Sequence, residues 1–107
     1  MAFVVYEKAK LAVRAMAPVV ERVARRDRAL ADQMRRAGSS VLLNLAEGMQ
    51  TGGGRRRQSY QIAAGSAAEV RAALDVAEAW GYVDGQAVAS VEGHLDAVRA
   101  MLWRQAS

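Results

Sequence analysis

The sequence predicts an all-α protein, built as an up-down-up-down antiparallel four-helix bundle. First, the 107 residues are 52% hydrophobic, rich in Ala and contain one Pro, a composition that favours helices over strands. Second, apolar residues recur at intervals of three and four in four separate stretches. Third, these stretches of about 20 residues are joined by short segments, which makes neighbouring helices antiparallel. A chain of this length is expected to form one domain, residues 1–107.

The first helix is expected from about Val4 to Arg25. Its apolar seam has a heptad-like spacing and consists of Val5, Ala9, Ala12, Met16, Val19 and Val23. Pro18 lies inside this pattern, where it removes one backbone hydrogen bond and clashes with the preceding turn. The helix should therefore kink or split near residues 16–17. Because the apolar spacing continues past Pro18, we predict a kink.

The second helix is expected from about Arg28 to Met49. Asp27 precedes it and can accept a hydrogen bond from a free N–H of the first turn, while Gly48 is a natural stop. One side carries the seam Leu30, Met34, Ala37, Val41, Leu45 and Gly48. Leu43 falls on the opposite side, which a monomer would keep polar. Apolar groups on both sides predict burial on both, one against this chain and one against another copy.

A flexible loop is expected over residues 50–54, because consecutive glycines make a helix costly there. The third helix then runs from about Arg55 to Trp80, with the seam Tyr60, Ala63, Ala67, Val70, Leu74 and Ala77. Small residues over 63–68 would let a neighbouring helix approach closely.

The last junction carries two recognisable helix-end signals. Gly81 suits the left-handed position that ends a helix, so that Tyr82 beyond it can fold back on the last turn. Asp84 is the expected N-cap of the fourth helix. That helix continues to the end of the sequence with the seam Val88, Val91, Leu95, Val98 and Leu102.

Several short motifs between residues 6 and 82 resemble those of a known family. They are Arg35-Arg36-Ala37, Ser40-Val41, Asn44-Leu45-Ala46-Glu47-Gly48, Ile62-Ala63, Gly65-Ser66-Ala67-Ala68-Glu69 and Gly81-Tyr82. Together they are similar to the signature of the bacterial four-helix-bundle proteins encoded by intervening sequences in 23S ribosomal RNA genes. The Gly52–Gly54 run and Pro18 depart from that pattern. Members of this family, and the similar accessory proteins of diversity-generating retroelements, are ring-shaped homopentamers. The resemblance therefore implies a pentamer, whereas the residues alone argue only for some oligomer.

The sequence lacks the residues that most catalytic and cofactor chemistry needs. Without Cys there are no disulfides, thiolate nucleophiles or Cys-based metal sites, and this composition fits the cytoplasm. The single histidine, His94, cannot complete the Glu-x-x-His pairs of a di-iron bundle. Gly52–Gly54 before Arg55 could hold a phosphate, but a slack turn is the favoured interpretation because no P-loop pattern follows. We expect no catalytic residue, metal or cofactor, and no membrane-spanning segment.

Positive charge is concentrated in the first half of the chain. The formal net charge is +4, with 12 basic and 5 acidic residues over 1–57 but 3 basic and 6 acidic residues over 58–107. The candidates for binding nucleic-acid phosphates are Arg22, Arg25, Arg26, Arg28, Arg55, Arg56 and Arg57. A solvated basic face is the alternative interpretation. No aromatic residues interleave with these arginines in the sequence, so base-specific recognition is not predicted.

Polar residues on the second and third helices are candidates for an interface between copies. They recur at helical spacing beside Leu43, and the full set is Arg36, Ser40, Leu43, Asn44, Glu47, Ser66 and Glu69. Arg36 could pair with Glu47 or Glu69 across a helix or a subunit contact, and such groups fix register and partner number in helical interfaces. Two functions follow as hypotheses. One is a non-enzymatic homo-oligomer that binds RNA or DNA without sequence preference, and the other is a scaffold that binds another protein.

Overall fold

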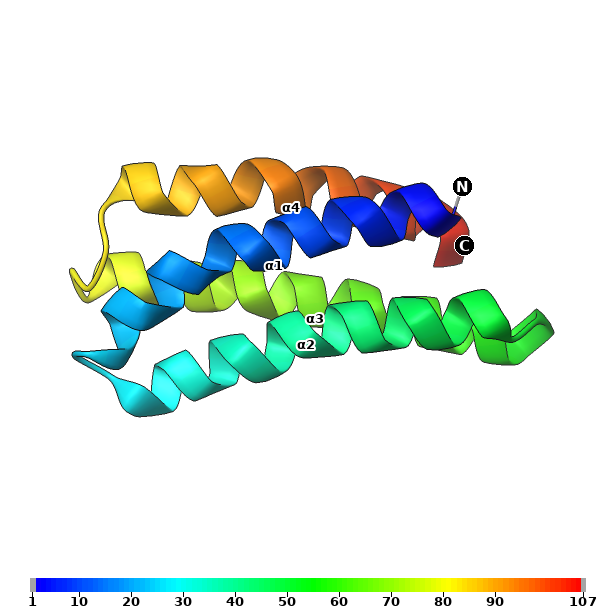
Figure 1. Ribbon diagram of the computed structural model, residues 1–107, viewed down its shortest axis with the longest axis horizontal. Helices are drawn as coiled ribbons and strands as arrows, with labels where there is room; N and C mark the ends of the chain where they lie inside the picture. Colours follow the sequence, from blue (N-terminus) through cyan, green and yellow to red (C-terminus); the bar gives the residue numbers. More distant parts are fainter. Residues whose placement is uncertain (1, 107) are drawn as a thin grey trace.

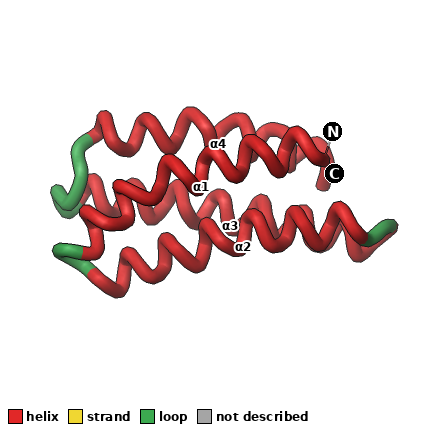
Figure 2. Tube along the Cα trace, viewed as in Figure 1, coloured by secondary structure: helices red, strands yellow, loops and turns green. Residues whose placement is uncertain are grey.

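The computed structural model describes residues 2–106, with side chains described over residues 3–104. Figures 1 and 2 show the helices running antiparallel in the order up-down-up-down, with no strand among the described residues. Their bounds are α1 Ala2–Ala24, α2 Arg28–Gln50, α3 Gly53–Ala79 and α4 Gly85–Ala106. Each helix packs against two neighbours, so that α1 contacts α2 and α4 while α3 also contacts α2 and α4. The all-α four-helix bundle predicted from the sequence is confirmed.

The core consists of the seams that the sequence predicts. Every residue of the four seams is buried, and the apolar side chains among them form one continuous cluster along the bundle axis. Tyr60, Met34 and Leu45 are among the largest side chains that are fully buried. Ala31, Ala73 and Val83 are also buried, although the simple spacing omits them. Burial of these apolar faces supplies the main driving force for helix association.

Three predicted helix ends are confirmed. The Asp27 carboxylate accepts a hydrogen bond from the Leu30 N–H at 3.0 Å, and the Asp84 carboxylate accepts one from the Ala87 N–H at 2.9 Å. Gly81 has a φ of 77°, so it occupies the left-handed region expected of it. The N–H of Tyr82 donates to the Ala77 carbonyl at 2.9 Å, and the Gly81 N–H donates to the Glu78 carbonyl at the same distance. These two bonds satisfy carbonyls that the end of α3 would otherwise leave free.

The connection between α2 and α3 differs from its prediction. Gly48 does not stop α2, which runs on to Gln50, and the non-helical connection is only Thr51 and Gly52. Gly48 is buried, and a Cβ on it would overlap the ring of Tyr60. The close approach of α3 therefore requires a glycine at this position. The flexible loop expected over residues 50–54 is wrong, because helical hydrogen bonding takes up both of its ends.

Pro18 lies inside α1, which continues without interruption to Ala24. The first helix is therefore not split, and the angle of a kink stays a prediction. Figure 1 also shows that the α2–α3 hairpin extends beyond the N-terminal end of α1 and the C-terminal end of α4. The connections between α1 and α2 and between α3 and α4 lie together at the other end. This topology divides the candidate arginines between two separate ends of the bundle.

Candidate functional site

The candidate arginines fall at two ends that we name by their connections. The junction end comprises residues 21–28 and 78–84, where α1 passes into α2 and α3 passes into α4. The hairpin end comprises residues 47–57, where α2 passes into α3. All seven candidate arginines are exposed, four at the junction end and three at the hairpin end. The fold therefore places the two sequence clusters at opposite ends of the bundle.

At the junction end, Tyr82 joins the α3–α4 connection to the α1–α2 connection. Its hydroxyl donates to Asp27 Oδ2 at 3.2 Å, and the guanidinium carbon of Arg26 lies 5.6 Å from the centroid of its ring. This is within the range of a cation–π contact. Partial burial, followed by the hydrogen bond to the Asp27 carboxylate and the negative charge of that group, raises the pKa of Tyr82, which Arg26 partly offsets. Arg26 is therefore engaged within the protomer.

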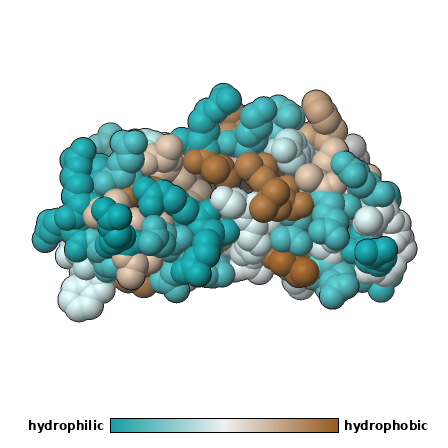
Figure 3. Space-filling view, turned by 60° about the horizontal axis from the view of Figure 1, so that its bottom comes forward, coloured by the Kyte–Doolittle hydropathy of each residue, from teal (hydrophilic) through white to brown (hydrophobic). Residues whose placement is uncertain are grey.

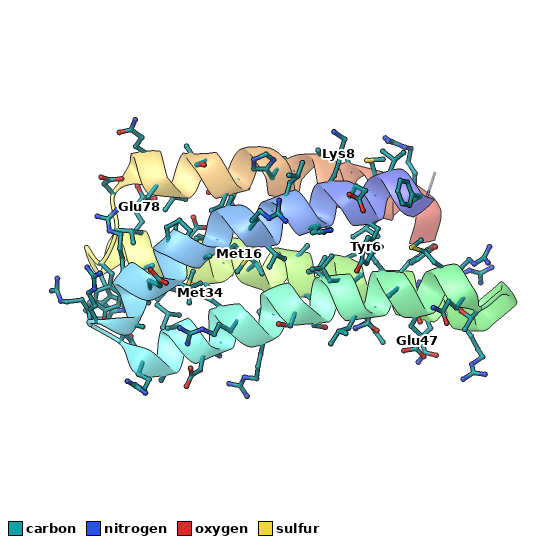
Figure 4. All side chains as sticks on the ribbon, in the orientation of Figure 1. Tyr6, Lys8, Met16, Met34, Glu47 and Glu78 are labelled. Carbon is teal, nitrogen blue, oxygen red and sulfur yellow. The ribbon has the colours of Figure 1, made fainter. Side chains whose placement is uncertain are left out.

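The formal charges of the side chains at the junction end balance. Its four arginines, Arg22, Arg25, Arg26 and Arg28, share the end with the four acidic residues Glu21, Asp27, Glu78 and Asp84. Figure 4 places Glu78 beside the α3–α4 connection. Attraction of a polyanion by net charge alone is correspondingly weak there.

Charge at the hairpin end is not balanced. Residues 47–57 contain three arginines and one acidic residue, Glu47, which points away from the bundle in Figure 4. The first turn of α3 contains no acidic residue, and the partial positive charge of that helix N-terminus adds to the arginines. Arg56 Nε donates to the Gly48 carbonyl at 3.0 Å, which ties α3 to the end of α2. Within the described chain, Arg55 and Arg57 make no ion pair and remain exposed to solvent.

The predicted interface residues divide into an inner and an outer group. Ser66 is buried and donates to Ser40 Oγ at 2.7 Å, while Asn44 Nδ2 donates to the carbonyl and hydroxyl oxygens of Ser40 at 2.9 and 3.1 Å. These bonds lie within α2 and between α2 and α3, so the structure accounts for them without a second copy. Arg36, Glu47 and Glu69 are exposed. The expected ion pair of Arg36 with Glu47 or Glu69 is absent from the described residues.

Leu43 faces away from the core, as the helical wheel predicts. Its side chain is 68% exposed. It lines a shallow hollow of about 360 Å³ on α2, together with Arg35, Arg36, Ser39, Ser40 and Asn44. The structure therefore brings Arg36, Ser40, Leu43 and Asn44 onto one surface. On α3, Ile62 and Val76 are also partly exposed, which the sequence pattern did not single out.

An apolar groove separates α1 from α2 near the middle of the bundle. It has a volume of about 290 Å³, and its apolar lining comes from Val13, Met16, Ala17, Val20, Met34 and Gly38. Figure 3 shows apolar side chains gathered near the middle of the molecule, with hydrophilic ones toward both ends. Glu21, Arg35 and Ser39 lie along the groove as its polar lining. This set contains no nucleophile paired with a base, so we assign it no chemistry.

No metal-binding group of three or more His, Asp or Glu side chains occurs in the described part of the chain. His94 is exposed on α4, in keeping with a surface role. Among the helices described, none is long and apolar enough to cross a membrane.

Two features of the surface carry no strong sequence signal. Arg71 on α3 bridges to α4, where its Nε lies 2.8 Å from Glu92 Oε1 and its NH1 lies 3.3 Å from Asp96 Oδ1. The spacing of Glu92 and Asp96 by four residues is the only hint, since it places both on one face of a helix. Trp80, at the end of α3, is 69% exposed. Its position at the junction end depends on the fold, so sequence spacing alone did not reveal it.

Comparison with known proteins identifies relatives in family and in fold. The family described as 23S rRNA-intervening sequence protein matches residues 1–104. A crystal structure of a protein of unknown function, from the S23 ribosomal protein family of Bacteroides thetaiotaomicron, is similar with a TM-score of 0.84 at 19% sequence identity. The similarity covers 96% of this chain and 98% of that one, and at this identity it supports the fold alone. No curated protein matches the chain. Neither match concerns retroelement accessory proteins, so that resemblance stays a prediction.

Proposed function

We propose, from the premise that this chain belongs to the 23S rRNA-intervening sequence protein family, that it is a non-enzymatic, homo-oligomeric bundle that binds nucleic-acid phosphates in the cytoplasm. The observation that carries the proposal is the unbalanced positive charge of the hairpin end. Arg55 and Arg57 are exposed and unpaired within the described chain, on a hairpin that projects past the neighbouring helices. Guanidinium groups bind phosphate oxygens in a bidentate manner, without reading the base sequence.

Self-association is supported by the outer side of α2. Leu43 is an exposed apolar side chain in a hollow rimmed by Arg36 and Asn44, which suits a contact that buries Leu43 and satisfies its polar neighbours. The two halves of the chain also carry opposite net charge, which favours contacts between unlike faces of successive copies. Such head-to-tail contacts close into a ring when the rotation fits, and we propose five copies. A ring would repeat each hairpin end around its axis.

Fluorescence anisotropy with labelled RNA and duplex DNA tests the binding, at low and near-physiological salt. We expect saturable binding with a steep salt dependence, because each neutralised phosphate releases counterions. The double variant Arg55→Ala/Arg57→Ala should weaken binding and reduce the salt slope by about two for each protomer that engages the polymer. Arg56 is left in place because its hydrogen bond to Gly48 holds the hairpin.

The matched control is Arg14→Ala/Arg99→Ala, which removes the same charge from exposed positions outside both ends. If both double variants lose the same affinity, binding depends on net charge and not on the hairpin end. No binding of the native protein at low salt would overturn the proposal and leave the second candidate, a scaffold for another protein. That candidate is favoured by the exposed apolar side chains of Leu43, Ile62 and Val76.

Sedimentation tests the oligomer. The native protein should sediment as a multiple of its 11.5 kDa protomer. Leu43→Glu should dissociate it with its helix content unchanged, because the substituted side chain is exposed in the protomer. Lys10→Glu, an exposed charge change on α1, is the control. A monomeric native protein would contradict the proposed self-association.

A further inference from the structure

The junction end presents an indole ring to solvent on a well-held backbone. Trp80 is 69% exposed, whereas aromatic rings of this size normally bury most of their surface. Its backbone N–H donates to the Val76 carbonyl at 3.0 Å, and the next two residues make the hydrogen bonds that close α3. The backbone that carries the indole is therefore held by consecutive hydrogen bonds. A ring on such a backbone loses less conformational freedom when it contacts a partner.

Tyr82 links the end of α3, which carries Trp80, to the first connection. Tyr82 follows Trp80 by two residues, a reach of at most about 7 Å along the chain. The Tyr82 hydroxyl bonds to Asp27, and its ring contacts Arg26. The Tyr82–Asp27 hydrogen bond therefore ties the end of α3 that carries Trp80 to the segment 25–28, although more than fifty residues separate them in sequence.

The arginines on either side of Asp27 are available to an external anion. Both carboxylate oxygens of Asp27 are already used, one by the Leu30 N–H and the other by the Tyr82 hydroxyl. One carboxylate oxygen of Asp84 likewise accepts a hydrogen bond from the Ala87 N–H. Arg25 and Arg28 are exposed and form no ion pair within the described chain. Because Glu21 and Glu78 offset part of their charge, phosphate contacts alone would hold a polyanion only weakly here.

We propose that the junction end is a binding site for single-stranded nucleic acid, in which an unpaired base stacks on Trp80 while Arg25 and Arg28 contact the adjoining phosphates. A duplex keeps its bases stacked inside, so it cannot offer a free base face to the indole. The hairpin end needs only phosphates and accepts either form. This inference rests on the proposed function, since it specifies which form of nucleic acid the second end prefers.

Tryptophan fluorescence gives a direct test, because the chain has two tryptophans and Trp103→Phe leaves Trp80 as the only one. The Trp103→Phe protein is titrated with a short oligouridylate, with oligothymidylate and with a blunt duplex of the same length. We expect both single strands to quench Trp80 in a saturable manner and the duplex to leave its emission unchanged. A difference between the two single strands would identify RNA or DNA as the preferred source of the unpaired base.

The second measurement compares affinities by anisotropy. Trp80→Ala should weaken single-strand binding by about tenfold, the effect of losing one base–aromatic stack, and should leave duplex binding unchanged. Trp80→Phe should restore part of the loss because it keeps an aromatic face. Arg55→Ala/Arg57→Ala should weaken binding of both forms and leave the single-strand quenching in place.

The outcomes separate this inference from the proposed function. Binding of single strands without quenching of Trp80, or equal quenching by the duplex, would overturn the junction-end site and leave phosphate binding at the hairpin end intact. No binding of any of the three polymers would overturn both. The Trp103→Phe protein could show quenching of Trp80 while the Trp80→Ala protein keeps full single-strand affinity. That result would also overturn the site, because the stack would then contribute nothing to binding.

Discussion

The junction end and the hairpin end carry similar arginines but differ in what those arginines face. At the junction end, four acidic residues offset four arginines, and Arg26 lies over the ring of Tyr82. At the hairpin end, three arginines meet one acidic residue, and only Arg56 is engaged, with the Gly48 carbonyl. A count of basic residues therefore does not measure a binding surface. The partners that the fold supplies decide which guanidinium groups remain for a ligand.

The two ends also differ in what stabilises them. The hairpin end depends on close packing, because Tyr60 occupies the space where a side chain on Gly48 would lie. The junction end depends on hydrogen bonds, since Asp27 links the start of α2 to Tyr82. Substitutions that remove one kind of interaction should therefore affect one end and spare the other.

The largest effect is expected from Gly48→Val. The added side chain overlaps the Tyr60 ring, and overpacking of this kind costs about 1–3 kcal/mol of unfolding free energy. Thermal denaturation followed by circular dichroism measures it. Gly65→Ala is the matched control, because a Cβ there meets no atom within 4 Å. It should stabilise the protein by roughly 0.5–1 kcal/mol through helix propensity. A Gly48 variant as stable as Gly65→Ala would contradict the packing role of Gly48.

An intermediate effect is expected from Asp27→Ala. Losing an N-cap costs about 1 kcal/mol, and this variant also leaves the Tyr82 hydroxyl without its acceptor. Asp84→Ala removes only a cap, since the Asp84 carboxylate accepts a single hydrogen bond from Ala87. Urea denaturation should therefore rank the native protein above Asp84→Ala, and Asp84→Ala above Asp27→Ala. Equal losses for the two variants would mean that the Tyr82 bond adds nothing to stability.

The smallest effect concerns alkaline pH. The pKa of Tyr82 is raised above its ordinary value of 10.0, first by partial burial and then by Asp27, so the folded state favours the protonated phenol. Its contribution to stability is complete below the unfolded-state pKa and is lost as the pH rises through the higher folded-state pKa. Tyr82→Phe should remove that part of the decline, as measured by denaturation midpoints between neutral and strongly alkaline pH. An identical pH dependence in the variant would exclude Tyr82 as its source.

Much of the fold could be predicted because its signals are local in sequence. The spacing of Val41 and Leu45 places both on one face of α2, and Leu43 on the other, whatever the neighbouring helices are. The caps at Asp27 and Asp84 are equally local, since each carboxylate bonds to an N–H three residues away. The positions of the helices, their seams and most of their ends therefore follow from the sequence.

The candidate site could be predicted only in part, because contacts between helices carry no periodic signal. The sequence identifies the seven arginines as candidates for binding phosphate. It does not predict the hydrogen bond from Arg56 to Gly48 or the contact of Arg26 with Tyr82. Arg36 forms no ion pair with Glu47 or Glu69 within the described protomer, and a pair across a subunit contact stays a prediction. Arg71, which the sequence pattern did not single out, bridges from α3 to α4. Side-chain pairing depends on the rotation and offset of two packed helices, which no single helical pattern specifies.

An all-α bundle, its buried seams and an exposed Leu43 could thus be predicted from the sequence alone, because each depends on the period of one helix. Three features follow only from the packed helices: Gly48 is a point of close packing, Ser40 and Ser66 meet inside the protomer, and Tyr82 contacts the first connection. Each of these depends on which helices become neighbours and how closely they approach. That outcome is fixed by the packing of all four seams at once, and it reaches residues far apart in the chain.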